Sequence, residues 1–552
     1  MTLRTAAARP FSRALRSLLV VAVVAASALA GAAIPAASAN ATGETGSIHG
    51  SVRVWDPMGT KPANVTPYAV SLAGGEITVS QADGLGNYRF DGLPVGDYVL
   101  YVQNWSACDV CMQKIWSGNT PYRSAAEIIT VSASSDTVVD FLSPLGGGIS
   151  GTVTRAAGLS GVTVGVTAIL IDPGTGELSI DAVFSTFISG SGYTLRQLPP
   201  GDYLVRFAPS NDVIGAASYW EDGQWIADAS LVTVDGTETV TGIDATVGET
   251  PTLITRFAGA DRFEMAVGLS QVHSPGVQVV FVANGLDFPD ALSAGPAAAH
   301  LGGPILLVRP DAIPDVVASE LDRLAPQRII VVGGTNSVRP AVFDQLGGYA
   351  DEVTRIDGAT RFDSSRNLVA TAFDSARTVY IATGNTFPDA LSAGGAAGSI
   401  DAPVLLVNGH SDSVNPADAA LLASLGTTRV IIAGGPASVS PEYLRAVADL
   451  PGVVEVTRRA GRDRFEASFV INQQAFPAAD VIMLATGLNF PDALAGGPLA
   501  GAWGAPTYLI GRDCVPYIVV SVVVSKQPHL IVVLGGPNSL SPAIDEFIPC
   551  ME

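Results

Sequence analysis

The sequence predicts a multidomain chain in which two antiparallel β-sandwich domains are followed by three α/β repeats. Two kinds of internal repetition carry this prediction, and they change over near residue 250. The first half holds short alternating apolar runs between turns rich in Gly, Pro and Asp, which is typical of antiparallel sandwiches. The second half alternates continuous apolar runs with helix-like stretches, which indicates parallel sheets with helical crossovers.

The chain begins with a segment typical of a secretory signal peptide. Four arginines precede an apolar run at 18–30, which is too short to span a bilayer comfortably, and Ala37-Ser38-Ala39 fits a cleavage site. We therefore expect residues 1–39 to be removed from an exported protein. We expect no transmembrane segment in the mature chain.

The mature chain is strongly acidic. Since the segment to residue 39 holds four arginines and no acidic residue, the remainder has 26 basic and 51 acidic residues and a formal charge of −25. Nucleic acids and anionic membranes are bound through basic surfaces, so the charge argues against both as partners.

Four cysteines are consistent with an oxidising compartment. Cys514 and Cys550 bracket the end of the chain, and a bridge between them would contribute about 4 kcal/mol in the loop-entropy model. Cys108 and Cys111 form a C-x-x-C pair. Because neither a redox-type helix nor a second ligand pair lies nearby, we expect a short local disulfide there.

The two predicted sandwiches, at 46–145 and 147–248, repeat the same motifs. Gly-Asn-Tyr-Arg-Phe at 86–90 matches Gly-Tyr-Thr-Leu at 192–195, and a Gly-Asp-Tyr turn into a strand follows in both. These units resemble the carboxypeptidase-regulatory-like or SpaA-type prealbumin-like sandwiches of bacterial surface proteins.

Three motifs then recur three times in fixed order. An opening motif holds a glycine followed by Arg-Phe, a Phe-Pro-Asp-Ala-Leu motif begins 29 residues after that glycine, and a Gly-Gly pair with a later serine completes the copy. We place the copies at 253–350, 351–452 and 453–552.

Each copy is predicted to be an α/β unit. Its strands are continuous apolar runs, its first long helix begins with proline, and its second has helical periodicity. In the first copy the expected strands are 278–283, 305–308 and 328–332, and the expected helices are 289–301 and 313–324. The first of these helices is rich in Ala and Gly, which suits close packing of the copies against one another.

These motifs make the region from about 253 to 550 similar to the cell-wall-binding repeat type 2 family. The resemblance implies three Rossmann-like α/β repeats in a pseudo-threefold arrangement, and a monomer with an internal pseudo-trimer. It also implies non-covalent anchoring to a Gram-positive cell wall through an anionic secondary wall polymer, with no chemistry or cofactor. The sandwiches would then be stalk domains.

The arginines of the opening motif are the expected polymer-binding residues. A guanidinium grips a phosphate or carboxylate bidentately, and these arginines would form positive spots on an acidic chain. They are Arg256, Arg262, Arg355, Arg361, Arg458 and Arg464. The alternative is that each arginine pairs with the motif aspartate of its own copy and fixes the fold.

The resemblance also implies that an apolar Ile-Leu-Leu stretch contributes to polymer binding. It corresponds to Ile305, Leu306 and Leu307 in the first copy and to Val404, Leu405 and Leu406 in the second. The third copy departs from the pattern, with Tyr-Leu-Ile at 508–510. The alternative is that these residues are core strands.

The motif aspartates Asp290, Asp389 and Asp492 fall in the first turn of a helix, where free N–H groups and the helix dipole stabilise a carboxylate. No acid or base partner accompanies them, so we expect a structural role. The Gly-Gly pairs lack nucleotide-binding spacing. We expect tight turns there, with helices capped by the serines Ser337, Ser438 and Ser539.

Nothing in the sequence favours an enzyme. The five histidines are scattered singly without the spacing of metal ligands, no nucleophile elbow occurs, and no segment is left over for a catalytic domain. The alternative function is a carbohydrate-binding or starch-binding-like accessory protein, or an adhesin, with its ligand site in the sandwiches. Tryptophans that could stack on sugars there are Trp105, Trp116, Trp220 and Trp225.

Overall fold

A computed structural model describes most of the chain after the expected signal peptide. Its described residues are 9–10, 44–56, 59–62, 65–73, 77–104, 114–143, 146–156, 159–209, 217–221, 223–248, 252–287 and 292–550. The expected cleavage site, Cys108, Cys111 and Asp290 lie outside them. The chain divides into two compact units, one built mainly from residues before 253 and the other from 253–523 and 530–552.

The N-terminal unit contains two sandwiches, as predicted. In the first, one sheet has the order β10-β2-β11 with β3 and β6 also on β2, and the other has the order β5-β4-β7-β8 with β9 on β7. Its strands are β2 (Thr45–Asp56), β3 (Gly59–Pro62), β4 (Val65–Ser71), β5 (Ile77–Val79), β6 (Asn87–Pro94), β7 (Gly96–Asn104), β8 (Lys114–Trp116), β9 (Ile129–Val131), β10 (Asp136–Val138) and β11 (Phe141–Ser143).

The second sandwich repeats this topology, except that no strand of its described residues corresponds to β3. Its sheets have the orders β15-β12-β19, with β20 on β12, and β14-β13-β16-β17, with β18 on β16. Its strands are β12 (Gly147–Arg155), β13 (Val164–Ile171), β14 (Leu178–Ile188), β15 (Gly192–Leu198), β16 (Gly201–Pro209), β17 (Ser218–Tyr219), β18 (Leu231–Val234), β19 (Thr239–Val240) and β20 (Ala245–Val247). Short 3₁₀ turns, η4 (Arg123–Ala125) and η6 (Ile226–Asp228), occupy matching places in the two sandwiches.

The sandwiches are mainly antiparallel, as predicted, but each also contains parallel pairs that the sequence did not indicate. The last two strands of each sandwich run parallel to the first strand: β10 and β11 pair with β2, and β19 and β20 pair with β12. The reason is the connection that precedes them. After β9 or β18 the chain crosses from one sheet to the other, so it enters beside the first strand in the same direction.

The C-terminal unit contains the three predicted α/β copies. Their first three strands are β22 (Val279–Asn284), β23 (Ile305–Val308) and β24 (Arg328–Val332); β26 (Thr378–Thr383), β27 (Val404–Val407) and β28 (Arg429–Ala433); and β30 (Val481–Thr486), β31 (Thr507–Ile510) and β32 (Leu530–Leu534). All pair in parallel, in the order second-first-third. The expected strands 305–308 and 328–332 are confirmed, and the strand expected at 278–283 is shifted by one residue.

Helices connect these strands in each copy. They are α2 (Arg262–Ser270), α3 (Ala294–Leu301), α4 (Asp315–Leu324) and α5 (Pro340–Leu346); α6 (Arg361–Ala372), α7 (Pro388–Gly398), α8 (Pro416–Ser424) and α9 (Pro441–Ala448); and α10 (Arg464–Ala475), α11 (Pro491–Ala502), α12 (Tyr517–Lys526) and the 3₁₀ turn η7 (Pro542–Ile544). The predicted start at the motif proline is confirmed for α7 and α11.

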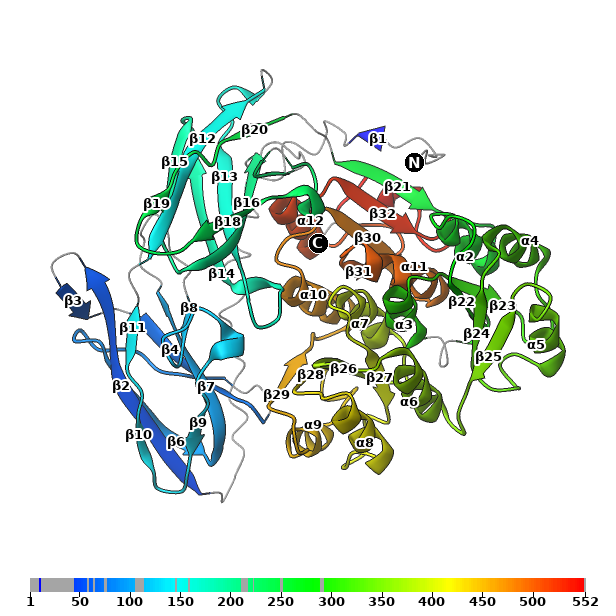
Figure 1. Ribbon diagram of the computed structural model, residues 1–552, viewed down its shortest axis with the longest axis horizontal. Coiled ribbons are helices and arrows are strands. Elements are labelled where there is room, and N and C mark those ends of the chain that lie inside the picture. Colours follow the sequence, from blue (N-terminus) through cyan, green and yellow to red (C-terminus); the bar gives the residue numbers. More distant parts are fainter. Residues whose placement is uncertain are drawn as a thin grey trace. The chain divides into compact units, whose positions relative to one another are not determined.

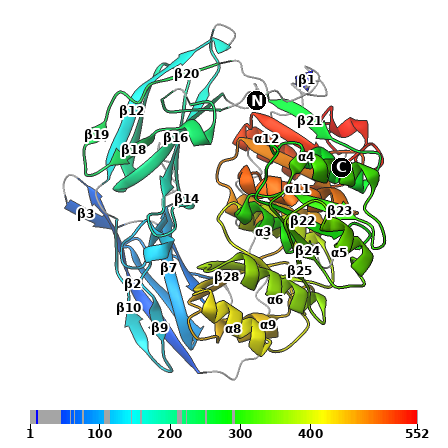
Figure 2. The ribbon, with the colours of Figure 1, turned by 45° about the vertical axis from the view of Figure 1, so that its right-hand side comes forward.

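The strand that carries each opening motif joins the sheet of the preceding copy. These strands are β21 (Leu253–Phe257), β25 (Glu352–Ile356) and β29 (Glu455–Arg459). Strand β25 pairs with β24, as Figure 2 shows at the edge of the first sheet, and β29 pairs with β28. Strand β21 pairs with β32 of the third copy (Figure 1). The three copies therefore form a closed ring.

Three helices rich in small residues, α3, α7 and α11, lie side by side at the centre of this ring (Figure 1). A methyl group added at Gly398 would lie 3.0 Å from Gly501 Cα and 3.2 Å from Ala299 Cβ. The helices approach so closely here that even one added methyl group would crowd the neighbouring backbone. The close packing expected from their composition is confirmed.

Among the residues that the structure describes, no helix combines the length and the apolar character needed to cross a membrane.

Candidate functional site

The first arginine of each opening motif fastens its strand to the preceding copy. Its guanidinium donates to the carbonyl oxygen of the first glycine in that copy's Gly-Gly turn. The pairs are Arg256–Gly535 at 2.6 Å, Arg355–Gly333 at 2.7 Å and Arg458–Gly434 at 2.8 Å. Each of these arginines thus joins two copies.

Arg256 makes further contacts near the C-terminus. It forms an ion pair with Asp545 at 2.9 Å and donates to the carbonyl oxygens of Leu540 and Ser541 at 2.9 and 3.1 Å. Its side chain is 13% exposed. These bonds use most of its donors for holding the fold.

The second arginine of each motif begins a helix and binds a turn in its own copy. Its guanidinium donates to the carbonyl oxygen of the glycine that follows the first strand. The pairs are Arg262–Gly285 at 2.6 Å, Arg361–Gly384 at 2.9 Å and Arg464–Gly487 at 2.7 Å. Arg262 and Arg361 are half-buried, and Arg464 is exposed.

Phenylalanines of the preceding copy lie against these second arginines. The guanidinium carbon of Arg262 lies 5.7 Å from the ring centroid of Phe490, and that of Arg464 lies 5.7 Å from the ring of Phe387. The rings of Phe387 and Phe490 are themselves 6.1 Å apart. The opening motifs of copies 1 and 3 therefore face a shared aromatic group. Sequence reasoning missed these phenylalanines, although their recurrence at the start of the second motif was the available signal.

The motif aspartates are buried at the same junctions. Asp389 and Asp492 are 7% and 8% exposed. Burial raises the pKa of Asp389, opposed by a hydrogen bond from Ser438 and by the charges of Arg464 and Arg458. The pKa of Asp492 is raised in the same way, opposed by a hydrogen bond from Ser539 and by the charges of Arg262 and Arg256. Each aspartate thus faces two arginines.

The structure corrects the alternative in which each arginine pairs with the aspartate of its own copy. Asp389 of copy 2 faces the arginines of copy 3, and Asp492 of copy 3 faces those of copy 1. The reason is that the opening strand lies in the sheet of the preceding copy. The motif aspartate Asp290 lies outside the described residues.

The Gly-Gly turn leaves room for the aspartate. Gly434 has a φ of 108°, and a methyl group there would lie 2.3 Å from Oδ2 of Asp389. Gly535 has a φ of 116°, and a methyl group there would lie 2.4 Å from Oδ2 of Asp492. The helix-capping role predicted for Ser438 was wrong, because this hydroxyl binds Asp389 instead. Ser440 caps α9, accepting from the backbone N–H of Tyr443 at 3.0 Å.

The opening motifs also contain the N-caps of their helices. The side chains of Asp261 and Asp463 accept hydrogen bonds from backbone N–H groups of the first turns of α2 and α10. Thr360 takes this place in the second copy and forms a capping box with Asp363. Since Thr and Asp are both good N-caps, the substitution of Thr for Asp at this place keeps the cap of the helix.

The apolar stretches lie in the core. Ile305, Leu306, Leu307, Val404, Leu405 and Leu406 form β23 and β27 and are buried, and the third copy's 508–510 is also buried. Serines of the neighbouring helices hydrogen-bond the backbone of these strands. Ser365 Oγ accepts from Leu406 N at 2.9 Å, and Ser468 Oγ accepts from Leu509 N at 2.8 Å. The side chains of the three apolar stretches are therefore part of the core and are not exposed at the surface.

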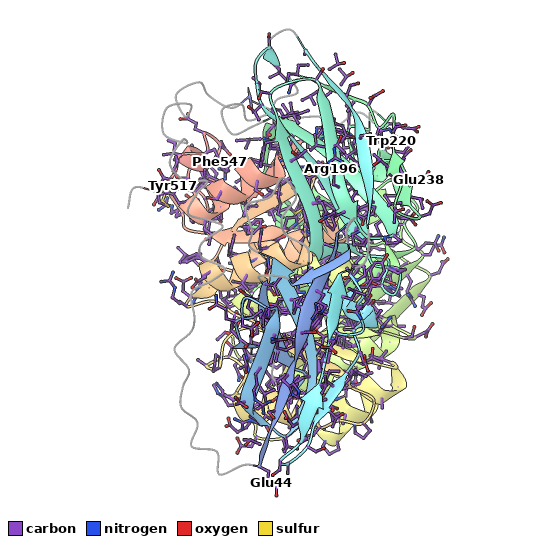
Figure 3. All side chains as sticks on the ribbon, turned by 90° about the vertical axis from the view of Figure 1, so that its left-hand side faces the viewer. Glu44, Arg196, Trp220, Glu238, Tyr517 and Phe547 are labelled. Carbon is purple, nitrogen blue, oxygen red and sulfur yellow. A yellow bond between two sulfur atoms is a disulfide. The ribbon has the colours of Figure 1, made fainter. Side chains whose placement is uncertain are left out.

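The tryptophans of the alternative site are dispersed over the sandwiches. Trp116 is buried, with the guanidinium of Arg123 5.2 Å from its ring, and Trp220, labelled in Figure 3, packs partly buried against the second core. Trp225 is exposed. Trp105 lies outside the described residues.

Cys514 and Cys550 form a disulfide, as predicted, and it closes a sequence separation of 36 residues. The C-x-x-C pair at 108 and 111 lies outside the described residues. Within the described part of the chain, no cluster of three His, Cys, Asp or Glu side chains could hold a metal ion.

The family described as cell wall binding domain 2 (CWB2) matches residues 256–343, 355–444 and 458–545. The chain carries three copies of cell wall binding domain 2. Each match begins at the first arginine of an opening motif, the residue that fastens one copy to the preceding one. The CWB2 repeats identify a cell-wall surface protein.

Two relatives come from Bacillus subtilis (strain 168). The amidase enhancer is 28% identical over 308 residues, which cover 56% of this chain and 42% of that protein. The N-acetylmuramoyl-L-alanine amidase LytC is 24% identical over 288 residues, which cover 52% of this chain and 56% of that protein. The chain spans about half the length of the curated relatives it matches.

Among solved structures, Cwp8 from Clostridium difficile is similar to this chain. It is 16% identical, with a TM-score of 0.50, and the match covers 82% of this chain and 88% of that chain. At this identity the likeness concerns the fold.

Proposed function

We propose that the three CWB2 repeats hold this protein on the cell wall by binding an anionic wall polymer through Arg262, Arg361 and Arg464. The observation that carries the proposal is the contrast between the two arginines of each motif. The first arginines donate to the Gly-Gly turn of the preceding copy, whereas the second ones donate to a turn of their own copy at equivalent places around the ring, and Arg464 is exposed. One donor of each holds a turn, and a guanidinium carries five N–H donors in a planar fork that matches a phosphate or carboxylate.

Local charge supports binding of an anion. Asp389 faces both Arg458 and Arg464, so two guanidinium groups surround this one carboxylate. The whole chain has a formal charge of −21, so such positive groups stand out against an acidic background. An anionic polymer would be attracted to these junctions and repelled elsewhere.

The other residues predicted to bind the polymer instead stabilise the ring of repeats. Arg256, Arg355 and Arg458 hold the ring together, and the buried apolar stretches at 305–307 and 404–406 form its sheets. Their loss would weaken binding by disturbing the fold. We therefore expect no polymer contact with their side chains.

We further propose that the protein binds and does not catalyse, and that the sandwiches act as a stalk. One chain closes the ring of three copies, so a single molecule suffices for wall binding. In the described residues, the two sandwiches contact each other through Tyr122 Oη, which donates to Pro200 O at 2.9 Å, and Ser124 Oγ, which donates to Asp172 at 2.6 Å. Such contacts favour a stiff spacer.

The test uses the full mature chain and purified Gram-positive cell walls in a sedimentation assay. The variant carrying Arg262→Ala, Arg361→Ala and Arg464→Ala is expected to bind at least tenfold more weakly, since each charge-assisted contact contributes about 1.5–3 kcal/mol. The matched control is Arg445→Ala, because Arg445 is an exposed arginine of α9 paired only loosely with Glu442 at 3.3 Å. Equal binding of the triple variant and the control would contradict this site.

A further inference from the structure

Two leucines are exposed beside the proposed binding arginines. Leu286 is 50% exposed and Leu488 is 63% exposed. Each directly follows the glycine whose carbonyl oxygen accepts from a second arginine, Gly285 for Arg262 and Gly487 for Arg464. In the second copy the corresponding residue is Asn385, after Gly384. An apolar side chain and a guanidinium are therefore presented together in copies 1 and 3.

The turn that carries these residues is fixed in all three copies. The last residue of the first strand accepts a hydrogen bond from the backbone N–H two positions later. The pairs are Leu286 N to Asn284 Oδ1 at 2.9 Å, Asn385 N to Thr383 Oγ1 at 3.2 Å and Leu488 N to Thr486 Oγ1 at 3.2 Å. Such side-chain turns hold the backbone in one conformation, so the leucines are displayed on a defined scaffold.

The fold itself does not require leucine at this place. Asn385 occupies the same turn in the second copy, with the same backbone hydrogen bond and the same arginine contact. A polar residue is thus compatible with the turn, and an exposed leucine contributes little to folding. Its apolar surface would be removed from water if a ligand covered it.

We propose that Leu286 and Leu488 pack against the apolar faces of sugar rings in the polymer whose anionic groups Arg262 and Arg464 bind. This inference rests on the proposed function. A sugar ring offers a face of C–H groups next to its charged substituent, whereas a chain of glycerol phosphates offers no comparable face. The ligand class is therefore an anionic polysaccharide. Copies 1 and 3 recognise both charge and ring, and copy 2 recognises charge through Arg361 without the apolar contact.

The test exchanges the residues that differ between copies, in the full mature chain. The double variant Leu286→Asn and Leu488→Asn takes the side chain that the second copy already carries, so the turns are kept. We expect its affinity for a purified anionic wall polysaccharide to fall about tenfold, since two partly buried leucine contacts are lost. The reciprocal variant Asn385→Leu is expected to bind about threefold more tightly. The melting temperatures should stay within about 1 °C of the parent.

A second probe identifies the chemistry that the leucines contact. With poly(glycerol phosphate) as ligand, the double variant and the parent are expected to bind equally, because no ring face is lost. The tenfold loss on polysaccharide should also persist at high salt, where arginine contacts are screened. Unchanged polysaccharide affinity of the double variant, or equal losses on both ligands, would overturn this inference. Failure of the parent chain to bind any anionic polymer would instead contradict the proposed function.

Discussion

At the scale of single residues, the two arginines of each opening motif have different places. Sequence spacing shows that both arginines recur in every copy, but it does not indicate that their structural partners differ. The structure separates them because Arg458 lies on a strand of the preceding sheet, whereas Arg464 begins a helix of its own copy. The partner of each arginine depends on which sheet its strand joins, and this is not written in the repeat spacing.

The Gly-Gly turn gives a prediction at this scale. Gly434→Ala is expected to lower the free energy of unfolding by about 3 kcal/mol, since alanine at positive φ is strained and its methyl group would overlap Asp389. Gly435→Ala is the matched control, because a methyl group there has its nearest neighbour at 3.9 Å. Urea unfolding measures both. Similar losses for the two variants would contradict the place assigned to Asp389.

At the scale of elements, much of the fold follows from the sequence. Strands at 305–308 and 328–332 were predictable because buried parallel strands are continuous apolar runs. The parallel last strands of the sandwiches and the offset between sequence copies and sheets were not predictable. Both depend on which distant strand a segment pairs with, and periodicity reports only a segment's own conformation.

The central helices give a prediction about packing. Gly398→Ala in α7 is expected to destabilise the protein by about 1–3 kcal/mol, because its methyl group would meet Gly501 and Ala299 of the neighbouring helices. Gly394→Ala in the same helix meets nothing within 4 Å and should be neutral or stabilise by up to about 1 kcal/mol. Thermal unfolding of the two variants checks the contrast. A stabilising Gly398→Ala would show that the helices are not in close contact.

At the scale of the whole C-terminal unit, the ring is closed by β21 on β32, and every copy completes the sheet of another. Removing one copy would therefore expose strand edges and junction aspartates in its neighbours. The repeats are expected to unfold as one cooperative unit.

Hydrogen exchange tests this cooperativity. In the Gly434→Ala variant, whose defect lies in copy 2, global opening should become easier for all copies. Faster exchange is expected in β22 and β30 as well as in β26. An increase confined to the second copy would show three independent domains instead of a ring.

The central claim is that the ring of CWB2 repeats binds an anionic polymer of the wall. Its most direct test is the binding of the full mature chain to purified walls before and after chemical removal of that polymer, at rising ionic strength. The account predicts that removal lowers binding at least tenfold and that salt weakens binding to intact walls, since charge-assisted contacts are screened. Undiminished, salt-independent binding to walls stripped of the polymer would contradict it.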